Sequence, residues 1–80
     1  MAMNKDFLIA LGKRIDQLRK EKKLSFQELA DLCEMEKASL VKLTSQGNNI
    51  TINTLFNIAK GLNISMKELF DYDDQIPTAN

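Results

Sequence analysis

Apolar residues recur along this chain at spacings of three and four positions, which is the period of an amphipathic helix. A first helix over about residues 5–22 is predicted by the apolar stripe Leu8, Leu11, Ile15 and Leu18. Gly12 lies inside this helix, where glycine costs about 1 kcal/mol relative to alanine. We therefore expect a close packing contact at Gly12.

A second, shorter helix is predicted to begin directly after Leu24. Ser25 is a good N-cap, and Glu28 three residues later completes a Ser-x-x-Glu capping box. Apolar and small residues follow at helical spacing: Leu29, Ala30, Leu32 and Cys33. These features favour a helix that packs one face on a core and ends near Cys33.

The apolar pattern breaks at Cys33-Glu34-Met35 and then restarts as a third helix. Its predicted core stripe consists of Met35, Leu40 and Leu43, and its opposite, outward face carries Lys37, Ala38, Val41 and Lys42. Ala30 and Ser39 are small, as a close crossing of two helices requires. Two short helices that meet at a tight corner, the second one presented to solvent, form helix-turn-helix geometry.

Two further helices are predicted before the chain becomes acidic. The fourth begins after the N-cap Thr51 and has the buried stripe Ile52, Leu55, Ile58, Ala59 and Leu62, with Phe56 partly exposed. Ser65 and Glu68 form a second capping box, which starts a last helix through about Tyr72. We expect Leu69 and Phe70 to close the core.

With these residues in place, the chain resembles the lambda-repressor/Cro-like (XRE) family of bacterial and phage DNA-binding regulators. The segments that carry the resemblance are Leu11–Ile15, Leu24–Leu43, Leu55–Leu62 and Ser65–Phe70. It covers roughly residues 8 to 71 without an insertion. The resemblance implies an all-α, compact five-helix domain over residues 1–72, with the helix-turn-helix at helices two and three. Residues 73–80 are expected to form an acidic disordered tail.

The resemblance also implies a transcriptional regulator, acting as a repressor, that binds a pseudo-palindromic operator as a homodimer and reads the major groove with its third helix. Lys37 is placed to reach guanine O6 and N7, Ala38 and Val41 to pack on thymine methyls, and Lys42 to contact a base or a phosphate. Weaker candidates for DNA contacts are Gln27, Asn48, Asn49, Arg14 and Arg19. The dimer surface is expected at Met66, Phe70, Tyr72 and Ile76.

Four residues depart from the family's usual pattern. Phe26 replaces a glutamine of the second helix, and Glu34 replaces a glycine at the corner, where positive φ is common. Glu36 replaces the Ser or Thr that caps the third helix. Thr44 replaces a glutamate that pairs with the arginine aligned with Arg19, so Arg19 needs another acceptor or is free for a phosphate. For each basic candidate, an alternative is that the side chain only forms a solvated helix face. For Asn48 and Asn49, the alternative is that they are ordinary turn residues.

The charge distribution keeps a second function open. The formal net charge is zero, but residues 1–70 carry +3 and residues 71–80 carry three aspartates. A weakly positive domain and the four departures favour an alternative, an interaction module such as an antitoxin or anti-repressor partner. Exposed Phe26, Val41 and Phe56 would then form its protein-binding face. A third reading is a DNA-binding dimer that a protein partner switches.

The composition excludes most catalytic and metal chemistry. The chain has no histidine, one cysteine and no glycine-rich phosphate loop, so we expect no enzyme activity, no cofactor and no metal site. Cys33 is expected to be a buried apolar residue. No run approaches the ~20 apolar residues of a membrane span, and we expect a cytoplasmic, nucleoid-associated protein.

Overall fold

The computed structural model describes residues 5–47 and 49–72, and within them it is all-helical. Its elements are α1 (Lys5–Glu21), α2 (Phe26–Cys33), α3 (Lys37–Gln46), α4 (Ile52–Leu62) and α5 (Met66–Leu69). The predicted five-helix, all-α class is confirmed. The predicted tail, residues 73–80, lies outside the described residues, as does Asn48. Among the described helices, none combines the length and the apolar character needed to span a membrane.

The helix starts are fixed by the caps that the sequence predicts. The Ser25 hydroxyl accepts a hydrogen bond from the Glu28 backbone N–H, and the Glu28 carboxylate accepts one from the Ser25 N–H, at 3.0 and 2.8 Å. Ser65 and Glu68 form the same reciprocal pair at the start of α5. The Thr51 hydroxyl accepts from the backbone N–H of Thr54 at 3.1 Å. Each cap satisfies backbone donors that the first helical turn would otherwise leave unpaired.

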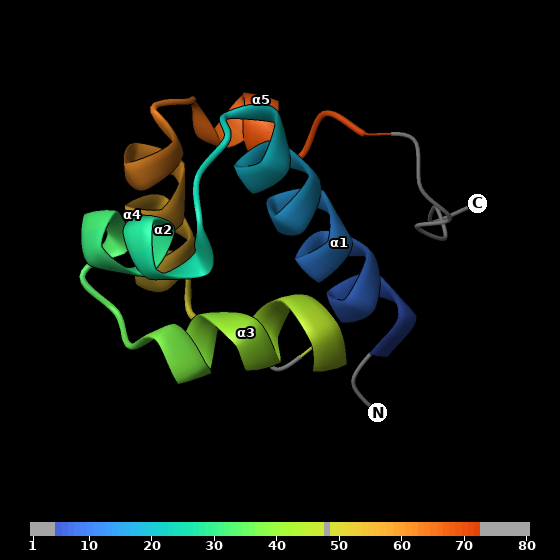
Figure 1. Ribbon diagram of the computed structural model, residues 1–80. Helices are drawn as coiled ribbons and strands as arrows, with labels where there is room; N and C mark the ends of the chain where they lie inside the picture. Colours follow the sequence, from blue (N-terminus) through green and yellow to red (C-terminus); the bar gives the residue numbers. More distant parts are fainter. Residues whose placement is uncertain (1–4, 48, 73–80) are drawn as a thin grey trace.

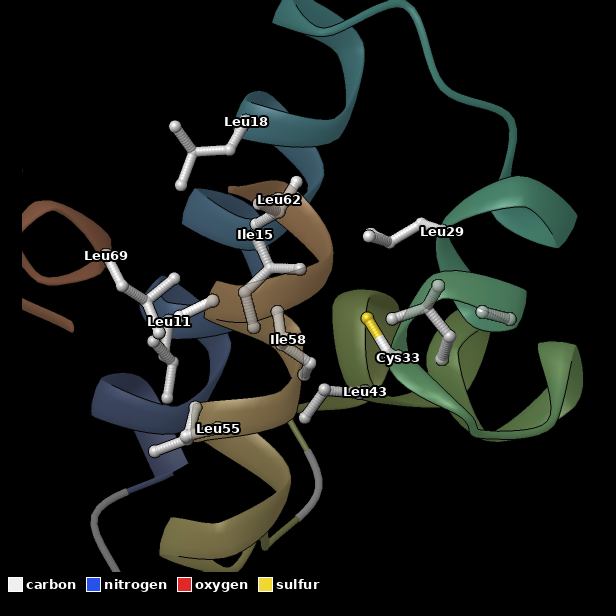
Figure 2. Packing of buried hydrophobic residues seen from close by; sticks show 13 residues of the cluster. Leu11, Ile15, Leu18, Leu29, Cys33, Leu43, Leu55, Ile58, Leu62 and Leu69 are labelled. Carbon is white, nitrogen blue, oxygen red and sulfur yellow. The ribbon is translucent and has the colours of Figure 1, made fainter. Parts of the chain in front are cut away.

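One hydrophobic core joins all five helices (Figure 2). Its fully buried large side chains are Leu11, Ile15, Leu29, Leu40, Ile58, Leu62 and Leu69. Helix α1 packs mainly on α3, and α2 packs mainly on α4. This arrangement leaves α3 along one edge of the molecule, with α5 near the opposite edge (Figure 1).

Two glycines let α1 and α3 approach each other closely. A Cβ at Gly12 would overlap the Leu43 carbonyl oxygen and lie 3.1 Å from the Thr44 Cα. Gly47 ends α3 in the left-handed conformation (φ 66°), and a Cβ there would lie 2.7 Å from the Ile9 backbone N. The close contact predicted at Gly12 is therefore confirmed, and its partner is the backbone of α3.

Several burial predictions were wrong, mostly at helix ends. Ile52 is 73% exposed because it is the first residue of α4 and precedes the turn that reaches the core. Phe70 is 37% exposed because α5 ends at Leu69, before the predicted Tyr72, and Phe70 has left helical geometry. Leu32 is also exposed, at 55%, and of the two small residues expected at the α2–α3 crossing Ala30 is buried and Ser39 is exposed.

Candidate nucleic-acid interface

The outer face of α3 presents the four residues that the sequence singled out. Lys37, Ala38 and Lys42 are exposed, and Val41 is partly buried. On a helix, residues four apart share a face, so Lys37 lies beside Val41 and Ala38 beside Lys42. Helix α3 itself runs along one edge of the molecule (Figure 1). An α-helix exposed in this way has the shape that a DNA major groove admits.

The corner between α2 and α3 is built without the glycine usual in the resembled family. Glu34 adopts the left-handed conformation itself, with φ 58° and ψ 44°. Its N–H donates to the backbone carbonyls of Ala30 and Asp31, and the Met35 N–H donates to the Ala30 carbonyl at 3.0 Å. A non-glycine residue pays about 1 kcal/mol for this conformation. The corner therefore keeps its geometry and accepts local strain.

Glu36 begins α3 but does not cap it with its side chain. Its backbone is extended (φ −75°, ψ 143°), and its carbonyl accepts the first helical hydrogen bond, from the Leu40 N–H at 3.1 Å. Its exposed carboxylate makes no cap hydrogen bond. The first turn of α3 is therefore fixed by the backbone, while the Glu36 carboxylate extends into solvent next to Lys37.

A groove of about 500 Å³ lies between α3 and the start of α4. Its lining residues are Met35, Ser39, Lys42, Leu43, Asn49, Ile50 and Thr54. Four of these lining residues carry hydrogen-bond donors. They are the ammonium of Lys42, the amide of Asn49 and the hydroxyls of Ser39 and Thr54. Thr51 donates its hydroxyl to Thr54 Oγ1 at 2.9 Å, which leaves the Thr54 hydroxyl proton for another acceptor.

Two of these groove donors, Ser39 and Thr54, were missed by the sequence analysis. Ser39 was assigned to a helix crossing, although it lies three residues before Lys42 and therefore shares its face of α3. Thr54 lies in the first turn of α4, a position where hydroxyls commonly serve phosphate contacts in DNA-binding proteins. The spacing from Lys42 and the nearby cap residue Thr51 were the signals that could have identified them.

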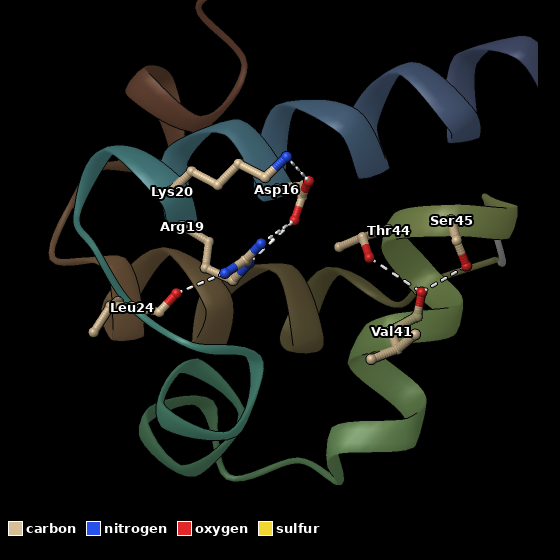
Figure 3. A network of polar contacts seen from close by, with 7 residues as sticks. All are labelled: Asp16, Arg19, Lys20, Leu24, Val41, Thr44 and Ser45. Carbon is tan, nitrogen blue, oxygen red and sulfur yellow. Dashed lines mark hydrogen bonds and ion pairs between the residues drawn. The ribbon is translucent and has the colours of Figure 1, made fainter.

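Arg19 donates hydrogen bonds to acceptors on α1 and in the turn after it, and not to the glutamate of α3 that the family usually has. Its guanidinium donates to Asp16 Oδ1 at 2.9 and 3.1 Å and to the Leu24 carbonyl at 2.7 Å (Figure 3). It also stacks on the Phe26 ring, so Phe26 packs against a side chain of the first helix. Thr44, which replaces the glutamate, donates its hydroxyl within α3 to the Val41 carbonyl at 3.1 Å.

Asp16 is the charged centre of this cluster. Lys20 Nζ lies 3.2 Å from its second carboxylate oxygen. Burial alone would raise the pKa of Asp16, but the hydrogen bonds and positive charges of Arg19 and Lys20 outweigh this effect and lower its pKa. The carboxylate is therefore kept ionised and holds Arg19 in place.

Arg14 binds the end of the last helix. Its guanidinium donates to the carbonyls of Glu68 and Leu69, at 2.8 and 3.3 Å, and lies 5.8 Å from the Tyr72 ring centroid. A cation suits the carbonyls at the end of a helix, and the Glu68 carbonyl also accepts a hydrogen bond from the Asp71 N–H at 3.1 Å. Gln27, on the exposed side of α2, donates its amide to Asp31 Oδ1 at 2.8 Å. The structure thus brings Lys42 and Asn49 together, whereas Arg14, Arg19 and Gln27 have intramolecular partners.

A sequence model of the Cro/C1-type HTH DNA-binding domain matches residues 14–75. The chain belongs to this family. No curated protein sequence matches the chain closely enough to count as a relative.

Solved structures agree with the assignment to the Cro/C1-type domain. The restriction-modification controller protein C.AhdI from Aeromonas hydrophila is 28% identical, with a TM-score of 0.77 over 80% of this chain and 97% of that chain. A point mutant of the controller protein C.Esp1396I is 26% identical, with a TM-score of 0.80 over 86% and 87%. The clp gene regulator ClgR from C. glutamicum, at 21% identity and a TM-score of 0.73 over 78% and 80%, shares the fold.

The family and the exposed α3 make this chain a DNA-binding helix-turn-helix regulator of transcription. The alternative, an interaction module that lost its DNA site, is not favoured. Two of its three supporting side chains, Phe26 and Val41, are partly buried, and only Phe56 is well exposed, at 50%. Glu34, another of the four departures, adopts the left-handed conformation at the corner that a glycine would provide.

Proposed function

We propose that the protein is a transcriptional repressor that binds a pseudo-palindromic operator as a homodimer. The observation that carries the proposal is the exposed face of α3. Lys37, Ala38 and Lys42 are exposed there, and neither lysine forms an ion pair among the described residues. The two similar controller proteins, named for the control of restriction–modification, support a regulatory role. Operator binding requires no catalysis, and we assign the protein none.

In this proposal the first half of α3 reads the bases. Lys37 donates to guanine O6 or N7, the commonest base contact of a basic side chain. Ala38 and Val41 pack on thymine methyl groups, for which small and apolar side chains are suited. The partial exposure of Val41 supports this assignment, since part of the residue stays accessible on the outer face of α3.

The second half of α3 holds the DNA backbone. The groove beside Lys42 offers one positive charge and donors from Ser39, Asn49 and Thr54, which together suit a single phosphate group. We extend this role to Asn48 on sequence grounds alone. Arg14, Arg19 and Gln27 support the site indirectly, because each already donates to a partner within the protein.

We place the dimer surface in the C-terminal segment of the domain, after the end of α4. Phe70 supports this placement, because its ring is exposed and not part of the monomer core. Phe70→Ala should convert the dimer to a monomer in sedimentation experiments and leave the helical content unchanged. A dimer that persists in this variant would remove Phe70 from the interface.

The decisive experiment selects DNA sites from a random pool and titrates the enriched site against salt. An enriched inverted repeat, bound by the wild type and weakened at least tenfold by Lys37→Ala, is the expected result. Lys60→Ala is the matched control, because Lys60 is an exposed lysine in the last turn of α4, outside both α3 and the proposed dimer surface. A pool without enrichment would contradict the proposal.

The proposal places the protein in the cytoplasm, associated with the nucleoid. A fluorescent fusion should follow the stained DNA, and Lys37→Ala together with Lys42→Ala should make its distribution diffuse. A fusion that is diffuse from the outset would contradict this location.

A further inference from the structure

Glu36 is a carboxylate without a partner among the described residues, at the end of α3 that carries the proposed base-reading side chains. Lys37 follows it directly and is likewise free of ion pairs among these residues. Glu36 makes no cap hydrogen bond, so its carboxylate oxygens are not engaged in capping α3. Its neighbour at the corner, Glu34, is also exposed but is occupied in shaping the turn through its backbone.

A carboxylate at this position has a defined effect on DNA binding. The phosphates of the duplex repel it, so it weakens binding to every sequence alike. In the major groove, however, hydrogen-bond donors occur at cytosine N4 and adenine N6. The adenine donor lies between two acceptors, its own N7 and the O4 of the paired thymine, both of which repel a carboxylate, whereas the cytosine donor has an acceptor, guanine O6, on one side only. Cytosine is therefore the base that best compensates the negative charge.

We infer that Glu36 is a specificity-determining residue that accepts a hydrogen bond from the N4 amino group of a cytosine in the operator. The inference rests on the proposed function and adds one base to the predicted half-site. Glu36 and Lys37 are consecutive, and their chemistries are complementary to cytosine N4 and to guanine O6 and N7. The pair selects a G·C base pair, or two adjacent ones, at the end of the half-site read by the N-terminus of α3.

In this inference the Glu36 carboxylate makes the protein distinguish cytosine from other bases, and it does not strengthen the binding to DNA as a whole. A site with cytosine satisfies it, and a site with another base leaves it desolvated near phosphates without a donor. Removing the charge should therefore have two opposite effects. Affinity for unrelated DNA rises, because a repulsive charge is lost, while the preference for cytosine at one position falls.

Glu36→Gln is the informative variant, because glutamine has the same shape without the charge. Glu34→Gln is the matched control, since it removes the same charge from the same corner and leaves an uncharged side chain of equal size. Site selection from random DNA is performed with the wild type and both variants, and the affinity of each for unrelated duplex DNA is measured. Thermal unfolding confirms that each variant is folded.

The wild type should enrich an inverted repeat with a cytosine at one position of each half-site. Glu36→Gln should keep the rest of the repeat, lose about tenfold in preference for that cytosine, and bind unrelated DNA more tightly. Glu34→Gln should keep the cytosine. If both variants enrich the same site as the wild type, the role of Glu36 is overturned and the proposed function stands. If the wild type enriches nothing, the proposed function itself fails, and the role of Glu36 with it.

Discussion

The Arg19 guanidinium lies 4.0 Å from the centroid of the Phe26 ring, so the end of α1 and the start of α2 are joined by a stacked cation and aromatic ring. The same guanidinium binds Asp16 on α1 and the Leu24 carbonyl in the connecting turn. One side chain thus fixes the angle at which α2 leaves α1. Because α2 supports α3 through the corner, this contact also helps to position the reading helix.

Replacing Phe26 with glutamine, the residue usual in the family, should lower the free energy of unfolding by about 1–2 kcal/mol. The ring is partly buried against the core, and its stacking on a partly desolvated arginine adds to that burial. Urea denaturation measures the change. Gln27→Ala, at the next and exposed position, serves as the control and should change stability by less than about 0.5 kcal/mol. Equal stability of wild type and Phe26→Gln would show that the stacking contributes nothing.

Much of the fold could be predicted from the sequence, because its signals are local. Capping boxes at Ser25 and Ser65 and apolar residues at helical spacing depend only on neighbours along the chain. The errors occurred where a side chain lies beyond the last turn that reaches the core. Periodicity extends the apolar stripe to Ile52 and Phe70, but only the packed structure shows that these two helix ends project past the core.

The candidate site was predicted less completely, for a related reason. The outward residues of α3 follow from its own period, and the structure shows Lys37, Ala38 and Lys42 exposed, with Val41 partly buried. The partners of Arg19 did not follow, because Asp16 and the Leu24 carbonyl become its acceptors only once the turn after α1 has formed. The groove beside Lys42 needs α4 to pack next to α3, which no pattern within α3 indicates.

Gly12→Ala should destabilise the protein by about 1–3 kcal/mol, the range expected for overpacking. The added methyl group would meet the backbone of α3 at Leu43 and Thr44, and a backbone cannot rotate away as a flexible side chain can. Thermal unfolding measures the effect. Lys13→Ala, on the exposed side of the same helix, is the control. If Gly12→Ala is as stable as the wild type, α1 and α3 can move apart to accommodate the methyl group without a loss of folding free energy.

The protein should lose stability in alkali as Cys33 ionises. Burial raises the pKa of the Cys33 thiol from its usual 9.0 to about 11, because the thiolate is poorly solvated there. Between these values the unfolded chain releases the proton and the folded chain keeps it, so stability falls as pH rises from about 9 to 11. The loss amounts to about 2–3 kcal/mol.

Cys33→Ala isolates this contribution, since every other ionisable group is the same in both proteins. Urea denaturation at several pH values should show a steeper alkaline loss in the wild type than in the variant. The folded wild type should also react slowly with a thiol reagent at pH 8. Parallel pH profiles, or rapid modification, would show that the thiol is accessible to water.

Lys42→Ala should weaken binding to all DNA sequences similarly. If Lys42 holds one phosphate in each protomer, the slope of log affinity against log salt should fall by about 0.9 per protomer. Asn49→Ala, which removes an uncharged donor from the same groove, should weaken binding without changing the slope. A Lys42→Ala variant that alters base preference instead would assign Lys42 to a base.

The two ends of α3 are held very differently. Gly47 and the Gly12 contact fix its last turns against α1, whereas Lys37, Ala38 and Ser39 in its first turn are exposed, and Glu36 has no cap bond. Substitutions at these exposed positions should therefore cost the fold little, while those at the packed end should cost much. As a consequence, this domain can acquire a new operator through changes at the first turn of α3 without first acquiring extra stability.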